Sequence, residues 1–333
     1  MKLDIFNHFF PKAFFDRMID LLPQGKGINK RVREVPSIHD LDERFRIMDK
    51  FDDYAQVICL PAPAIEDFGK HAVEMATIGN DGMAELVRKH KDRFPGFIAG
   101  LPMNEPDGLL KEAERAIKDL GAVGVQVYTN VLGRPLTDAA TMPLFDLMAH
   151  HDLPIWMHPI RAMNIPDYVG EPKSQYEIWW TFGWPYETSV AMAHMVFAGL
   201  FDKHPDLKII THHMGGMIPY FAGRVGPGWD QLGARTSDED LTLVLKRLKK
   251  RPLDYFKMFY ADTALFGTKP ATECGLEFFG ADHTLFASDS PFDPEKGSAY
   301  IRWTIEIIDS LNITPAERQA IYEGNARRLL KLN

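Results

Sequence analysis

Eight short β-rich segments recur along the 333-residue chain, with helical stretches between them. The segments span residues 3–9, 55–60, 97–102, 123–128, 154–158, 208–213, 258–262 and 284–289. Several are continuous apolar runs, as expected for strands that are buried on both faces of a parallel sheet. Residues 107–120 illustrate the helices, because their apolar side chains repeat with a period near 3.6. The eightfold alternation of strand and helix predicts an α/β fold, namely a single-domain (β/α)8 TIM barrel over residues 1–333.

Composition and charge exclude several classes of protein. The chain is 45% hydrophobic and 25% charged, as in globular proteins. Its net charge of −8 opposes a nucleic-acid surface, which needs clustered Lys and Arg. The basic run 246–251 is interpreted as the solvated end of a helix, with a binding patch as the alternative. The chain has two cysteines, no signal peptide and no apolar run of the roughly 20 residues that a membrane span requires. These features predict a soluble, cytoplasmic protein.

Polar side chains stand out at one end of the predicted strands. His8, His158, His213, Asp262 and Asp289 each lie at or near the C-terminal end of a strand. In a barrel these ends meet at one mouth, where catalysis is located. A single buried histidine is more often a core residue than a ligand, but five convergent polar residues favour an active site.

Imidazole and carboxylate groups together suit zinc, manganese or iron, and such a set leaves positions open for water or substrate. Asp289 follows apolar residues that tend to raise its pKa, so a metal or histidine partner is needed to keep it ionised. The alternative for Asp289 is a turn residue before Pro291.

Two further positions leave choices open. His212 and His213 are adjacent strand residues that face opposite ways, so only one is expected to enter the barrel. Asp262 is either a partner that orients a histidine or a cap at the end of its strand.

Residues 160–186 form a long insertion after the fifth predicted strand. Its aromatic residues are Tyr168, Tyr176, Trp179, Trp180, Phe182, Trp184 and Tyr186. Such a loop over the mouth predicts a lid or pocket wall for a flat substrate, with Trp180 in contact with it. A hydrophobic mini-core or a dimer contact is the alternative. Arg31, Arg33 and Arg224 could each hold a substrate carboxylate, or be ordinary surface charges.

Motifs spread over nearly the whole chain carry a family resemblance. They include Asp4 to Pro11 with His8, then His158-Pro159, His213-Met214-Gly215-Gly216, Ser288-Asp289-Ser290-Pro291-Phe292 and Gly324-Asn325-Ala326. With them the chain resembles the decarboxylase branch of the amidohydrolase superfamily. That group contains aminocarboxymuconate-semialdehyde decarboxylase and γ-resorcylate decarboxylase.

The resemblance implies roles for particular residues. His8, His158 and Asp289 would bind a divalent metal, zinc in the first place and manganese in the second. His213 would be the active-site histidine. Arg224 would reach into the pocket of a neighbouring subunit, which implies a homodimer or a dimer of dimers.

A further substrate-binding arginine of the family falls near Arg31 and Arg33. The loop alignment does not separate the two, and we take Arg33 as the candidate.

Phe6 departs from the family pattern, because relatives carry His or Glu at this position. Three protein ligands plus water still make a normal open site, so we expect metal binding that is weakened but retained.

The expected activity is non-oxidative decarboxylation of a hydroxylated aromatic or muconate-like acid. Asp289, alone or coupled to His213, would protonate the carbon that bears the carboxylate, which requires a raised pKa of Asp289. Hydrolysis or hydration of a lactone or an unsaturated acid is the alternative. A catalytically decayed barrel that serves as a binding protein is the third reading.

Overall fold

The computed structural model describes residues 1–24 and 28–332, and all eight predicted strand regions are present in it. The barrel strands are β1 (Lys2–His8), β2 (Tyr54–Cys59), β3 (Gly96–Phe97) with β4 (Ala99–Gly100), β5 (Val125–Tyr128), β8 (Ile155–His158), β9 (Ile209–Thr211), β10 (Tyr260–Asp262) and β11 (Thr284–Leu285). The short strands β6 (Asn130–Val131) and β7 (Arg134–Pro135) form a separate antiparallel hairpin.

The barrel strands pair in parallel and close into a ring. One sheet has the order β1-β2-β3, and the other has the order β11-β10-β9-β8-β5-β4. β3 and β4 flank Ile98 and join the two sheets. The ring closes where the Ile5 amide donates to the Phe286 carbonyl (3.0 Å) and the His8 amide donates to the Ser290 carbonyl (2.8 Å). The predicted (β/α)8 barrel is therefore confirmed.

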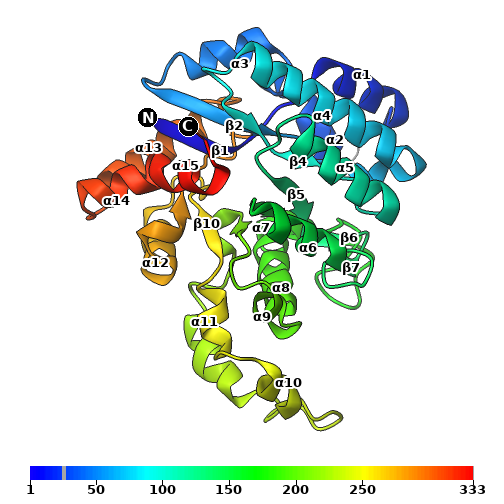
Figure 1. Cartoon of the computed structure of the whole chain (residues 1–333), viewed down its shortest axis with the longest axis vertical. Coiled ribbons are helices and arrows are strands. Elements are labelled where there is room, and N and C mark those ends of the chain that lie inside the picture. The colour runs from blue at the N-terminus through cyan, green and yellow to red at the C-terminus, as the bar shows by residue number, and fades with distance from the viewer. Residues whose placement is uncertain (25–27, 333) are drawn as a thin grey trace.

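Helices surround the barrel, and the amino terminus lies beside the last helices of the chain, where the Met1 amino group donates to Glu323 Oε1 at 3.3 Å (Figure 1). The helices are α1 (Lys12–Leu21), α2 (Ile28–Arg33), α3 (Leu41–Met48), α4 (Ala72–Lys89), α5 (Pro106–Lys118), α6 (Met142–His151), α7 (Ile178–Thr181), α8 (Gly183–Phe197), α9 (Leu200–Lys203), α10 (Thr242–Arg247), α11 (Pro252–Phe256), α12 (Lys269–Phe279), α13 (Ala299–Ser310), α14 (Pro315–Gln319) and α15 (Asn325–Leu330). Within the described residues, no helix has the length and apolar character needed to cross a membrane.

Alternate strand residues separate into two hydrophobic clusters, as the two faces of a strand require. Val57 and Ile210 belong to the cluster inside the barrel, whereas their neighbours Ile58 and Ile209 pack between barrel and helices. β1 departs from this alternation, because its register against β2 shifts between Asp4 and Asn7. Ile5 and Phe6 consequently both join the interior cluster.

Candidate active site

The predicted polar residues meet at the C-terminal mouth of the barrel. His8, His158 and Asp262 are the last residues of β1, β8 and β10. Asp289 follows β11, and His213 begins a short helical turn just after β9. All of these side chains are buried.

Asp289 is the centre of this cluster. Its Oδ1 lies 2.9 Å from His8 Nε2 and 3.4 Å from His212 Nε2, and its Oδ2 lies 3.7 Å from His213 Nε2. Possible metal-ligating atoms of His8, His158 and Asp289 all lie within 4.8 Å of one another. The same limit holds for a second group, His212, His213 and Asp289. The sequence-predicted residues are therefore brought together around one carboxylate.

The expectation that only one of His212 and His213 enters the barrel is wrong, since both rings approach Asp289. β9 ends at Thr211, and the backbone of His213 has a φ of 54°. Once the chain turns in this way, the alternation of side chains along a strand no longer applies. His212 is the residue that sequence reasoning set aside.

Asp262 holds this pair of histidines in place. Its Oδ2 pairs with Nδ1 of His212, and its Oδ1 accepts hydrogen bonds from the backbone amides of His213 (3.0 Å) and Ala264 (3.1 Å). Asp262 thus makes both kinds of contact that the sequence offered as alternatives. It orients a histidine, and it also caps the end of its strand.

The charges of the cluster differ from those predicted. Burial alone would raise the pKa of Asp289, but the facing imidazoles of His212, His213 and His8 hold its pKa well below the usual range. The histidine partners expected to keep Asp289 ionised are therefore present, whereas the raised pKa expected for a proton donor is wrong. Burial opposes protonation of His212, yet Asp262 and Asp289 raise the pKa of its imidazole to about 9. Burial lowers the pKa of His158, which favours its neutral form.

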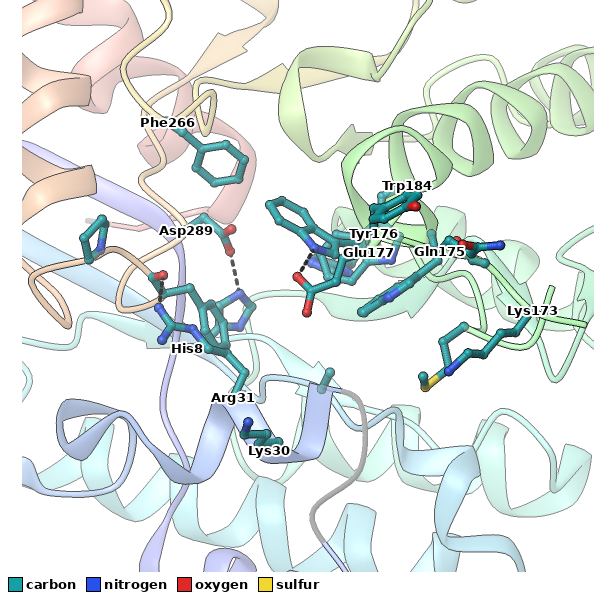
Figure 2. Close-up of a pocket in the computed structure, with 18 of the residues that line it drawn as sticks. His8, Lys30, Arg31, Lys173, Gln175, Tyr176, Glu177, Trp184, Phe266 and Asp289 are labelled. Atoms are coloured by element: carbon teal, nitrogen blue, oxygen red, sulfur yellow. Dashed lines mark hydrogen bonds and ion pairs between the residues drawn. The ribbon is translucent and has the colours of Figure 1, made fainter. Parts of the chain in front are cut away.

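A cavity of about 860 Å³ lies over the cluster. His8, His158 and Asp289 line it, and the insertion 160–186 forms another wall with residues that include Trp179, Trp180 and Trp184. Figure 2 shows His8 and Asp289 on one side of the cavity and Glu177 and Trp184 across from them. Trp180 donates through Nε1 to the Glu177 carboxylate (3.0 Å). The insertion thus provides an aromatic wall opposite a buried carboxylate and imidazoles.

With this geometry established, comparison with known proteins identifies the family. A family model described as amidohydrolase matches residues 4–332. The chain belongs to the amidohydrolase family. The γ-resorcylate decarboxylase of Polaromonas sp. (strain JS666) is 34% identical to it over 310 residues, which cover 88% of this chain and 87% of that protein. The 2-amino-3-carboxymuconate-6-semialdehyde decarboxylase of Dictyostelium discoideum is 28% identical, with 100% and 92% covered.

Solved structures give the same result. A 2,6-dihydroxybenzoate decarboxylase in complex with 2,6-dihydroxybenzoate superposes with a TM-score of 0.78 and 27% identity, covering 99% of each chain. A dihydroxybenzoic acid decarboxylase from Polaromonas sp. JS666, with bound manganese and the inhibitor 2-nitroresorcinol, has a TM-score of 0.78 and 28% identity. The match covers 100% of this chain and 97% of the Polaromonas chain. The resemblance inferred from the motifs is confirmed.

In this amidohydrolase the arginine that lines the cavity is not Arg33, which we took as the candidate from the sequence. Among the described residues, the cavity lining includes Arg31 but neither Arg33 nor Arg224. Arg31 donates through Nη2 to the Phe292 carbonyl (2.6 Å). Arg33 instead donates to the carbonyls of Leu22 and Pro23. The structure therefore favours Arg31 over Arg33 as the arginine that faces a substrate.

Phe6 closes one side of the amidohydrolase site. Its fully buried ring lies 4.1 Å from the His212 ring and 4.8 Å from the His8 ring, centroid to centroid. It also stacks on His158 at 5.8 Å. A hydrocarbon ring therefore occupies the space between three imidazoles, and it contributes no ligand atom there.

The remaining donors fit a divalent metal ion. Nδ1 of His158 and Nε2 of both His212 and His213 are buried and, within the described residues, have no hydrogen-bond partner. Buried polar atoms of this kind usually have one. Nitrogen atoms that surround an ionised carboxylate are the ligands that zinc and manganese accept.

Proposed function

We propose that this amidohydrolase is a metal-dependent, non-oxidative decarboxylase of a hydroxylated aromatic carboxylic acid. The observation that carries the proposal is the buried side chain of Asp289 among His8, His158 and His212, beneath a cavity with an aromatic wall. The similar γ-resorcylate and 2,6-dihydroxybenzoate decarboxylases support the choice of reaction.

His8, His158 and Asp289 would hold the metal ion in this proposal. Their nitrogen and oxygen donors suit both zinc, the first expectation, and manganese, which is bound in the similar Polaromonas structure. When bound, a divalent ion polarises the carboxylate or hydroxyl oxygens of the substrate as a Lewis acid.

The protein's own residues bind the substrate and move its proton. Arg31 holds the substrate carboxylate, and Trp180 packs against the ring. Because Asp289 is ionised at rest, it first takes up the proton of the ring hydroxyl. It then delivers this proton to the ring carbon that bears the carboxylate. The bond to the carboxylate breaks, carbon dioxide leaves, and the electron pair restores the aromatic ring.

His213 has a positioning role in this scheme. Its Nε2 lies 3.7 Å from Asp289 Oδ2, so it directs the carboxylate that carries the proton. The product leaves as a phenolate and gains a proton from water, which balances the reaction.

The test is release of carbon dioxide from a panel of hydroxybenzoates by protein loaded separately with zinc and with manganese. Asp289→Asn should lower kcat/KM by about 10²–10⁴-fold, the range for loss of a proton-transferring group. His158→Ala should also lower kcat/KM, because it removes a proposed metal ligand. His150→Ala, at an exposed histidine away from the cavity, is the matched control. Wild-type rates in either variant, or hydration or lactone hydrolysis without carbon dioxide, would contradict the proposal.

We also propose a homodimer in which Arg224 serves the neighbouring copy. Arg224 is exposed and, in the described structure, lies outside the cavity of its own chain. Exposed aromatic side chains on the insertion and beyond it support an association surface, with Tyr176 89%, Phe182 66% and Tyr220 80% exposed. A cytoplasmic location is part of the proposal, because Cys59 and Cys274 are free thiols.

A further inference from the structure

A chain of buried hydrogen bonds links α3 and β2 to β1. Arg44 of α3 donates through Nη1 to Gln56 Oε1 (3.3 Å), and Gln56 of β2 donates through Nε2 to the Tyr54 hydroxyl (2.8 Å). Tyr54 in turn donates to Asp4 Oδ2 of β1 (2.6 Å). Each group donates to the next, from a guanidinium that only donates to a carboxylate that only accepts. All four side chains are buried, and we call them the buried network.

The two ends of the buried network hold the backbone that carries His8 and Asp289. At one end, Arg44 also donates through Nη2 to the His8 carbonyl. At the other end, Asp4 accepts from the Ser288 hydroxyl through Oδ2 and from the Ser288 amide (3.2 Å) through Oδ1. Ser288 immediately precedes Asp289. The network therefore connects the strand end that carries His8 with the segment that carries Asp289.

Asp4 also fixes the backbone that faces Asp289. Its Oδ1 accepts from the Phe6 amide (3.2 Å), within the register shift of β1. The Phe6 carbonyl then accepts from the Asp289 amide (3.1 Å). Asp289 has a φ of 60°, an unfavourable left-handed conformation for a residue other than glycine. Such a conformation persists only where the surrounding structure fixes it, and the contacts around Asp4 do so here.

Buried ionic groups are a costly way to fill a protein core. Taking the Asp4 carboxylate and the Arg44 guanidinium out of water costs free energy that apolar side chains of similar volume would not. Hydrogen bonds between such groups instead restrict distances and directions. The distance at issue here is the 2.9 Å between His8 Nε2 and Asp289 Oδ1 (Figure 2). Both residues belong to the set of donors that lies close enough together to share one ion.

We propose that the buried network positions His8 and Asp289 so that both bind one metal ion. Its four residues are positioning residues, because none of them belongs to the described lining of the cavity. They act through the backbone on either side of the two ligands. The inference rests on the proposed decarboxylase function and its metal site, and it adds the residues that set the geometry of that site.

Tyr54→Phe is the sharpest test, because it removes one oxygen atom from the middle of the network. Tyr255→Phe is the matched control. Tyr255 is also buried and also donates to a carboxylate, that of Asp202, but it lies in α11 and outside the described cavity lining. Three quantities are measured for the wild-type protein and both variants. They are the free energy of unfolding without metal, the Kd for manganese by competition with a chelator, and kcat and KM for 2,6-dihydroxybenzoate.

Both variants should lose stability, because each loses a buried hydrogen bond. Only Tyr54→Phe should raise the Kd for manganese, by about ten- to a hundredfold, the range for loss of a group that orients a metal ligand. At saturating manganese it should lower kcat with little change in KM, since the cavity lining is intact. An unchanged Kd in a folded Tyr54→Phe protein, or an equal rise in Kd for Tyr255→Phe, would overturn the inference.

Ser288→Ala tests the same network from its other end, and it decides the question if Tyr54→Phe does not fold. It removes the hydroxyl that donates to Asp4, so the Kd for manganese should rise, and an unchanged Kd would overturn the inference. Manganese binding also separates this inference from the proposed function. A wild-type protein that binds manganese but releases no carbon dioxide would remove the decarboxylase function, while the Kd values still decide the positioning role. A wild-type protein that binds no manganese would overturn the positioning role itself.

Discussion

Phe6 decides how firmly the histidine cluster can hold a metal ion. Its ring lies against the imidazoles of His8, His158 and His212. Phe6→His would place another nitrogen donor in this space, a fourth ligand beside His8, His158 and Asp289. A fully protein-ligated tetrahedral set binds more firmly than an open one. We expect about a tenfold lower Kd for manganese, equivalent to about 1.4 kcal/mol, measured by competition with a chelator.

The control for this prediction is Phe6→Leu, which keeps an apolar side chain without a donor atom. It should leave the Kd for manganese close to the wild-type value. A folded Phe6→His protein with an unchanged Kd would show that the ring does not stand in a ligand position.

At the residue scale, sequence reasoning succeeded where a strand carries the side chain to its end. His8 and His158 follow directly from this rule, because each is the last residue of its strand. That both His212 and His213 reach Asp289 could not be predicted in the same way, because His212 keeps an extended backbone and continues the inward alternation of Ile210, whereas His213 turns inward through its own positive φ. The low pKa of Asp289 depends on imidazoles far away in the sequence. The adjacent glycines 215 and 216 were the available signal that the strand ends early.

The insertion 160–186 acts as one wall of the cavity, and Trp180 is its clearest test. Trp180 lines the cavity, whereas its neighbour Phe182 is 66% exposed and lies outside the lining. Trp180→Ala should raise KM about two- to tenfold, because an aromatic contact of ~0.5–1.5 kcal/mol is lost. Phe182→Ala is the matched control and should leave KM unchanged in a steady-state carbon dioxide assay. Equal changes in both variants would argue against a specific contact.

At the element scale, the eight strand regions were predictable but their lengths were not. The predicted strand 97–102 is interrupted at Ile98 into β3 and β4. The predicted strand 284–289 forms a regular ladder only at Thr284–Leu285. Beyond that point the Asp289 amide still donates to the Phe6 carbonyl (3.1 Å), although Asp289 itself has a φ of 60°. An apolar run in the sequence therefore indicates that a segment is buried in the barrel. The residue at which its regular strand pairing ends depends on local turns.

The stability of the whole molecule should depend on a carboxyl group outside the catalytic cluster. Glu66 is 4% exposed, and burial raises its pKa from 4.5 to about 8. Between these values the folded protein retains a proton that the unfolded chain has lost. The free energy of unfolding therefore falls as pH rises through this window, by up to about 1.4 kcal/mol per pH unit from this group.

Glu66→Gln should remove this contribution to the slope. Denaturant unfolding measured from about pH 5 to about pH 8 tests the expectation, because the difference in stability between variant and wild type should grow with pH. Glu34→Gln, at an exposed position, is the matched control for the introduction of a glutamine. A pH-independent difference for Glu66→Gln would mean that this carboxyl group titrates normally in the folded protein.

Whether one chain makes a complete active site is a question for the whole assembly. Arg224 does not line the cavity of its own chain in the described structure, so any contact with substrate must occur in a second copy. Arg224→Ala and Asp289→Asn proteins should each be nearly inactive but still dimeric. Co-expression of the two should restore roughly a quarter of wild-type activity. Random pairing makes half of the dimers mixed, and each mixed dimer contains one site with both residues intact. Full activity of Arg224→Ala alone would place Arg224 outside the catalytic site, and inactive mixed dimers would contradict its action in the neighbouring subunit. Recovery of activity requires that the two subunits share one site.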